Sequence, residues 1–277
     1  MDEPNLTQPE ILPPLREESD SAQDASASSL PAYAGPGLVD ALAFFTMAIV
    51  LVLIFQGVGA TLAWHWKLFD HDTLQQISQE SRFTIPVMGL GYACVTAISF
   101  FLFSRAWHRP FAEGICWNFA VAKKYAGRLV LSGVVLAGLI QLGSNYLPVP
   151  KDLPVDSFFR TPLDAWMVAL FGSFVAPAFE ELAFRGFLYP ALRRWTGIVG
   201  AAVLTSLPFA LLHAQQVGHA FSPLLMVFLV SLTLTAVRQR TGSVAASTLV
   251  HATYNFSIFL AVFYASGGFQ HLDRLRD

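Results

Sequence analysis

Seven apolar runs dominate this sequence, and most are long enough for a helix to cross the hydrocarbon core of a membrane. They cover residues 41–63, 84–104, 128–147, 163–192, 197–214, 222–237 and 243–264. Backbone groups in lipid must be hydrogen-bonded within the protein, and no alternating strand pattern is present, so the runs predict helices. The expected fold class is an all-α, polytopic transmembrane helical bundle. It has seven spans, or eight if Pro177 and Pro190 divide the fourth run.

The composition agrees with a protein that lipid surrounds. Hydrophobic residues make up 54% of the chain and charged residues 13%, against about 25% charged residues in soluble domains. The net charge of -2 and the lack of a basic tract give no reason to expect nucleic acid as a partner. Cys94 and Cys116 form no C-x-x-C motif, so neither a disulfide framework nor a cysteine metal site is indicated.

The sequence divides into four parts. Residues 1–37 carry seven acidic residues against the single Arg16, show no periodic apolar face, and are predicted to be a disordered acidic tail. Residues 38–160 are expected to form an N-terminal transmembrane region of three spans. Residues 161–265 are expected to form a catalytic transmembrane region, and residues 266–277 a C-terminal tail.

Positive charges in the short loops predict the orientation, because loops rich in Lys and Arg stay on the cytoplasmic side. The second, fourth and sixth loops are the richer ones, so these loops and the N-terminus are predicted to be cytoplasmic. In a bacterial cell the protein would then lie in the cytoplasmic membrane. The residues concerned are Arg105, Arg109, Lys123, Lys124, Arg128, Arg193, Arg194, Arg238 and Arg240.

Ionisable residues within the spans cluster in the C-terminal half. A charge at the bilayer centre costs several kcal/mol and is a functional candidate by default. Glu181 and Arg185 are four residues apart and can pair on one helix face, whereas Glu180 points roughly 100° away. The paired carboxylate is expected to stay ionised and structural, and the poorly solvated Glu180 suits a general base. The alternative is a helix end at the interface with ordinary charges.

Two later runs carry further polar candidates. His213 follows Phe209 by four residues, and His251 shares a helix face with Asn255. A histidine near a helix end can be merely interfacial, and polar side chains can simply hold helices together. On unbroken helices, however, all these residues lie roughly 12 to 24 Å from the cytoplasmic helix ends. They could therefore converge on one buried cavity that opens toward the cytoplasm.

The motifs occur in the order Glu-Glu-x-x-x-Arg, Phe-x-x-x-His and His-x-x-x-Asn. H-E-x-x-H and G-x-S-x-G, which mark other hydrolases, are absent. The ordered trio resembles the CAAX prenyl protease 2 and bacteriocin-processing (CPBP) family of intramembrane proteases over residues 165–260. The resemblance implies hydrolysis of a peptide bond in a protein or peptide substrate. In the eukaryotic branch that substrate is lipid-modified, and bacterial relatives are linked to bacteriocin maturation or self-immunity.

The resemblance also implies roles for the matched residues. Glu180, helped by His213, would take a proton from the attacking water, and His251 and Asn255 would donate hydrogen bonds to the oxyanion. Glu181, Arg185 and Phe209 would support them. The sequence by itself establishes no cofactor. The alternative mechanism places one divalent metal such as Zn²⁺ on Glu180, His213 and His251.

Two other classes of function fit the same residues. One is a non-catalytic membrane scaffold or immunity protein that keeps the fold without the reaction. The other is a transporter that uses the buried Glu, Arg and His side chains as an ion path. Cleavage of a substrate would separate the protease from both.

Overall fold

The computed structural model describes residues 35–70, 73–148, 150, 154 and 158–275. The predicted acidic tail lies outside the described residues, apart from 35–37. All regular elements in the described part are helical, which confirms the all-α fold class. The helices after Gly35 pack as one unit, and the division of the chain at residue 160 stays a prediction.

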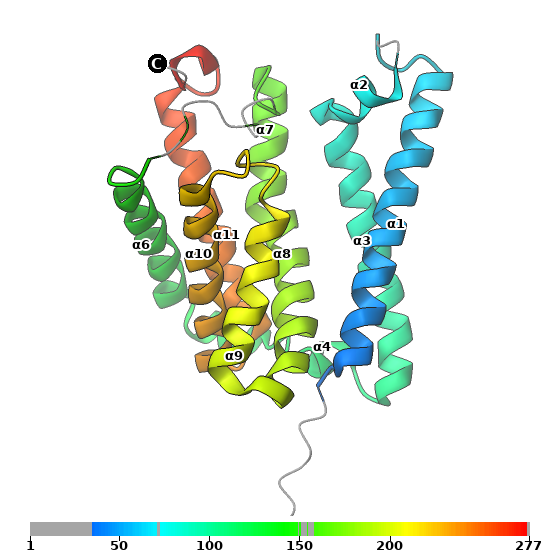
Figure 1. The fold of residues 1–277 in the computed structure, drawn as a ribbon, viewed down its shortest axis with the longest axis vertical. Helices are drawn as coiled ribbons and strands as arrows, with labels where there is room; N and C mark the ends of the chain where they lie inside the picture. The colour runs from blue at the N-terminus through cyan, green and yellow to red at the C-terminus, as the bar shows by residue number, and fades with distance from the viewer. Residues whose placement is uncertain (1–34, 71–72, 149, 151–153, 155–157, 276–277) are drawn as a thin grey trace, which may run out of the picture. The chain divides into compact units, whose positions relative to one another are not determined.

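The first two long helices are α1 (Leu38–His65) and α3 (Ser81–Trp107), which pack side by side as an antiparallel pair (Figure 1). The short α2 (Leu74–Ser78) connects them. Phe44 of α1 is fully buried, and its ring stacks on that of Phe187 with the centroids 4.3 Å apart. Aromatic packing therefore joins the N-terminal pair to the C-terminal half of the chain.

The third long helix, α6 (Ala126–Ser144), follows two short helices and packs against α11 (Val244–Ala265), the last long helix. The short helices are α4 (Phe111–Gly114) and α5 (Phe119–Lys124). A Cβ atom on Gly133 would lie 2.7 Å from both Thr253 Cβ and the carbonyl oxygen of Val250. The backbones of α6 and α11 approach so closely there that only glycine fits.

A helical run of 51 residues from Pro162 to Leu212 follows. It consists of α7 (Pro162–Leu170), the π-helical turn η2 (Phe171–Val175), α8 (Ala176–Glu181), the π-helical turn η3 (Leu182–Leu188) and α9 (Tyr189–Leu212). The run breaks at Gly197, where φ is 68° and ψ is -171°, values that favour glycine. In Figure 1 the chain descends through α8, turns, and rises again through the yellow part of α9.

The chain ends with α10 (Phe221–Thr241), α11 (Val244–Ala265) and a short 3₁₀ turn, η4 (Leu272–Leu275). The reversal between the two long helices uses Gly242 at a φ of 65°, followed by Ser243. The Ser243 hydroxyl caps α11 by accepting a hydrogen bond from the Ala246 amide at 3.2 Å.

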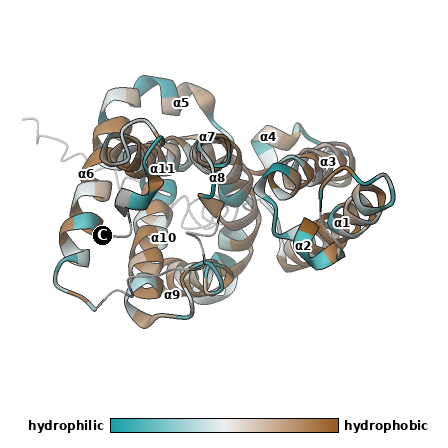
Figure 2. Ribbon diagram, turned by 90° about the horizontal axis from the view of Figure 1, so that it is seen from above, coloured by the Kyte–Doolittle hydropathy of each residue, from teal (hydrophilic) through white to brown (hydrophobic). Residues whose placement is uncertain are grey.

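Six helices of the described chain are long and apolar enough to cross a membrane, and the fourth is the 51-residue run. Dividing that run at Gly197 gives seven crossing segments, which correspond to the seven predicted runs. Pro177 and Pro190 each follow a π-helical turn and lie inside continuous helix, so the described residues provide no eighth span. Most of the helical ribbon in Figure 2 is hydrophobic, and many large apolar side chains face outward. The protein is a multi-pass integral membrane protein.

The close approach of α6 and α11 is testable with two glycines of one helix. We expect Gly133→Val to destabilise the folded protein by about 1–3 kcal/mol, because the new side chain overlaps the backbone of α11. Gly138→Val is the matched control, because a Cβ atom there meets nothing within 4 Å. Thermal unfolding of the purified proteins in detergent measures the difference. Equal unfolding temperatures for the two variants would contradict the packing described.

Candidate active site

Arg185 in η3 is fully buried and uses its whole guanidinium group. Nη1 donates to Oε1 of Glu181 at 2.9 Å, which is the predicted pair four residues apart. Nη2 donates to the carbonyl and the hydroxyl of Ser231 at 2.7 and 2.8 Å, and Nε donates to the Thr235 hydroxyl at 3.3 Å. The cation also lies 4.9 Å from the centre of the Phe209 ring. The planar fork of arginine suits this set of partners, whereas lysine would not.

His251 of α11 joins the two neighbouring glutamates. Its Nδ1 lies 3.1 Å from Oε1 of Glu181, and its Nε2 lies 3.7 Å from Oε2 of Glu180. The ionised Glu181 carboxylate can only accept hydrogen bonds, so Nδ1 carries the proton and Nε2 faces Glu180. The result is a buried chain of contacts from Arg185 through Glu181 and His251 to Glu180.

The two glutamates have different surroundings, but Glu180, which the sequence predicted to be poorly solvated, is the more exposed of the two. The Glu181 side chain is 0% exposed, and the Glu180 side chain is 20% exposed. Both lie at the end of α8, a single short helix between two π-helical turns. The inner carboxylate is therefore committed to Arg185, while the outer one can meet water or a substrate.

A small cavity of about 190 Å³ lies beside this chain of contacts, and His213, His251 and Asn255 line it together with Phe209. Nδ1 of His213 lies 2.8 Å from the carbonyl oxygen of Phe209. A carbonyl can only accept, so Nδ1 carries the proton and Nε2 keeps a free lone pair. No hydrogen bond or ion pair joins His213 to Glu180 in the described part of the chain. The structure thus places His251, the predicted oxyanion donor, next to Glu180.

Asn255 is held by the backbone of a π-helical turn. Its Nδ2 donates to the carbonyl oxygen of Gly172 in η2 at 2.7 Å. A π-helical turn interrupts the regular hydrogen-bond pattern of an α-helix and is frequent at functional sites. The amide group keeps a second N–H and its oxygen for other partners.

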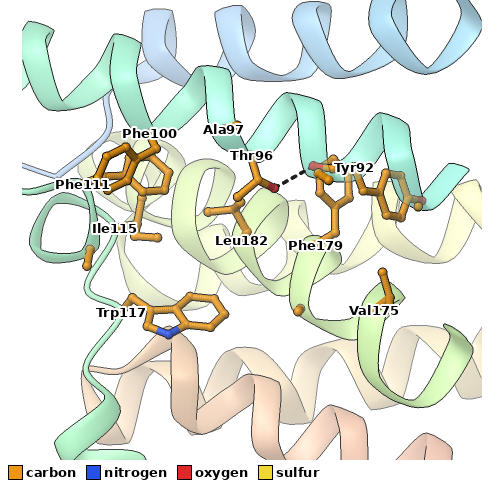
Figure 3. A pocket seen from close by; sticks show the side chains of 14 residues that line it. Tyr92, Thr96, Ala97, Phe100, Phe111, Ile115, Trp117, Val175, Phe179 and Leu182 are labelled. Carbon is orange, nitrogen blue, oxygen red and sulfur yellow. Dashed lines mark hydrogen bonds between the residues drawn. The ribbon is translucent and has the colours of Figure 1, made fainter. Parts of the chain in front are cut away.

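A larger cavity of about 620 Å³ lies between α3, α4 and the part of the long helical run around α8 (Figure 3). Its walls are mainly apolar and aromatic; α3 contributes Tyr92, and the helical run contributes Phe179, which lies beside Tyr92, and Leu182. Glu180 lines neither of these two cavities, but the residue before it, Phe179, lines the larger one, and its contact His251 lines the smaller one.

Glu180, His213 and His251, the residues predicted as metal ligands, belong to two different contact groups. Among the residues that the structure describes, no three His, Cys, Asp or Glu side chains are arranged to hold a metal ion. Glu181 engages only Nδ1 of His251, which leaves Nε2 as the atom that could bind a metal. Nε2 of His213 is also uncommitted. The metal-assisted alternative on Glu180, His213 and His251 therefore stays a prediction.

Comparison with known proteins identifies the family. The family model for type II CAAX prenyl endopeptidase Rce1-like proteins matches residues 162–257. The UPF0177 protein YbdI of Lactococcus lactis subsp. lactis (strain IL1403) is 32% identical over 159 residues, which cover 53% of this chain and 83% of that protein. No solved structure matches the chain significantly. The chain belongs to the CPBP family, whose Rce1-like members are membrane proteases.

Sequence reasoning missed several residues of the site. Ser231 and Thr235 hold Arg185, and their spacing of four on an apolar helix was a signal that could have been followed. Nothing in the sequence indicates that the Gly172 carbonyl contacts Asn255. That carbonyl becomes an acceptor for Asn255 only through the local π-helical geometry.

The buried ion pair gives a stability prediction. We expect Arg185→Met to destabilise the fold by about 3–5 kcal/mol, because it leaves the Glu181 charge buried without its partner. The double variant Glu181→Gln with Arg185→Met should be more stable than Arg185→Met alone, because no unpaired charge remains. Arg240→Met, at an exposed position, is the control and should change stability by about 0.5 kcal/mol or less. Detergent unfolding curves measure all three, and a double variant less stable than Arg185→Met would contradict the pairing argument.

Proposed function

We propose that this protein is an intramembrane endopeptidase that uses Glu180 to activate water. One observation carries the proposal: Glu180 lies at the partly exposed end of a buried chain of contacts that starts at Arg185 and passes through Glu181 and His251. The chain of contacts lies within residues 162–257, which the family model matches. Neither the scaffold nor the transporter alternative is favoured by this match.

The positions of the side chains support the following sequence of proton transfers. Water attacks the scissile carbonyl carbon while Glu180 accepts its proton. The free Nε2 of His213 faces the small cavity and is a second acceptor for protons during the cycle. When the C–N bond breaks, the protonated base returns its proton to the leaving amine. The products are a carboxylic acid and an amine, which become a carboxylate and an ammonium group when one proton passes from the acid to the amine, and no further reactant is required.

The developing oxyanion needs hydrogen-bond donors near the scissile bond. Asn255 has one amide N–H left after its bond to Gly172. His251 becomes a donor at Nε2 if it takes up a proton beside Glu180. Glu181, already ionised against Arg185, would stabilise the resulting imidazolium.

The substrate is proposed to be a protein or peptide that reaches the site within the bilayer. The larger cavity is apolar and aromatic, which suits an apolar or lipid-modified part of the substrate next to the peptide bond. We also propose that the protein lies in the cytoplasmic membrane with its N-terminus in the cytoplasm, because positive residues favour that side.

Comparing protein termini in cells tests the activity. We expect cells that produce the wild type to contain new termini that are absent from cells producing Glu180→Gln, because the amide cannot act as the base. Quantitative mass spectrometry of termini, at matched protein levels, identifies both activity and substrates. Glu113→Gln, an exposed acid in α4, is the matched control and should give the wild-type profile. Identical profiles for wild type and Glu180→Gln across growth conditions would reject the protease function.

Removal of metal separates the two mechanisms. The glutamate and histidine mechanism predicts that the purified protein keeps its cleavage activity after stringent chelation, because no step uses a metal ion. The measurement is the cleavage rate of an identified substrate peptide before and after chelation. Loss of activity that zinc restores would instead support the metal-assisted mechanism.

A further inference from the structure

A basic corner lies where α5 meets α6, at the end of the bundle that the positive residues predict to be cytoplasmic. It consists of Lys123 and Lys124 in the last turn of α5, Tyr125 between the helices, and Arg128 in the first turn of α6, and all four are exposed. Within the part of the chain that the structure describes, no ion pair joins these three cations to a carboxylate. The sequence has no Asp or Glu over residues 114–151, so the positive charge is not compensated locally.

Apolar side chains on both sides place the basic corner at the boundary between hydrocarbon and water. Phe119, one turn before Lys123 on α5, is 69% exposed. Beyond Arg128, α6 exposes large apolar side chains, as a helix in contact with lipid does. They are Val130, Leu131, Val134 and Val135. Cations so close to a lipid-facing segment of helix lie at the depth of the phospholipid headgroups.

Hydrogen bonds fix the backbone beneath the basic corner. The Asn118 side chain caps α5 by accepting from the Val121 amide at 3.1 Å, and the Asn118 carbonyl accepts from the Ser243 hydroxyl at 2.8 Å. The Val244 amide donates to the carbonyl oxygen of Cys116 at 3.0 Å. The turn between α10 and α11 therefore holds the segment that leads into α5. A fixed backbone lowers the entropy cost of bringing several cations to one ligand.

We propose that the basic corner binds the headgroup of an anionic phospholipid from the surrounding leaflet. Charge complementarity carries the assignment, because three cations without an acidic partner attract negative charge at the depth where lipid phosphates lie. Nζ of Lys124 lies 5.2 Å from the centre of the Tyr125 ring, which keeps its charge at the corner. The exposed Phe119 ring and the apolar face of α6 suit acyl chains, whereas a soluble acidic partner would leave them uncovered. The inference does not depend on the proposed protease function.

Thermal unfolding of the purified full-length chain in detergent, with lipid added in steps, tests this proposal. A ligand that binds only the folded protein raises the unfolding temperature, so we expect phosphatidylglycerol to raise it and phosphatidylcholine, which has no net charge, to raise it much less. In Lys123→Gln with Lys124→Gln the apparent affinity for phosphatidylglycerol should fall roughly 25-fold, about fivefold for each charge removed. Lys67→Gln with Arg105→Gln is the matched control. It removes two exposed charges in or beside α1 and α3, away from α5 (Figure 2), and should bind as the wild type does.

Further variants and probes separate the possible causes. Lys123→Arg with Lys124→Arg keeps both charges and should retain the wild-type affinity. Equal stabilisation by the two lipids, or unchanged affinity in the glutamine variant, would overturn the proposal and leave the cations a role in topology alone. Equal stabilisation by glycerol phosphate, which has the headgroup charge without acyl chains, would indicate a site for free anions instead. Stabilisation by a polyglutamate peptide but not by phosphatidylglycerol would assign the surface to an acidic protein.

Discussion

The site depends on one buried cation. A guanidinium group removed from water is strongly unfavourable unless several acceptors surround it, and Arg185 has them: a carboxylate, a carbonyl and two hydroxyls from two helical segments. This requirement holds η3 against α10 in a fixed register. It also keeps Glu181 ionised, and the ionised Glu181 in turn orients the ring of His251. The position of His251 relative to Glu180 is therefore a consequence of how Arg185 is satisfied.

The two π-helical turns are the second constraint. They enclose α8 on both sides, and each precedes a proline that lacks the amide hydrogen an α-helix would use. A π-helical turn inserts one extra residue into the helix, so it rotates the side chains that follow. In η2 it also makes the Gly172 carbonyl available to Asn255. Glu180 and Glu181 diverge because they are adjacent on the α-helical turn between them.

Much of this architecture could be predicted from the sequence. Span positions follow from apolar length, and the pairing of Glu181 with Arg185 follows from their spacing of four on a helix. Which histidine meets Glu180 could not be predicted. The sequence gives only how deep His213 and His251 lie along their helices. It does not give the direction in which each side chain points around its helix axis. That rotation is set by the π-helical turns and by the partners of Arg185, which are properties of the packed structure.

The proposed catalytic residues and the cavity wall proposed to meet the substrate come from different segments. Glu180, His213, His251, Asn255 and Arg185 lie within residues 162–257, which the family model matches. The opposite wall of the larger cavity, with Tyr92, Thr96 and Phe100, belongs to α3 and lies outside that range. Changes in α3 can therefore alter which substrates enter without disturbing the contacts between Arg185 and Glu181. The stack of Tyr92 on Phe179, the residue before Glu180, is one of the places where the two segments meet.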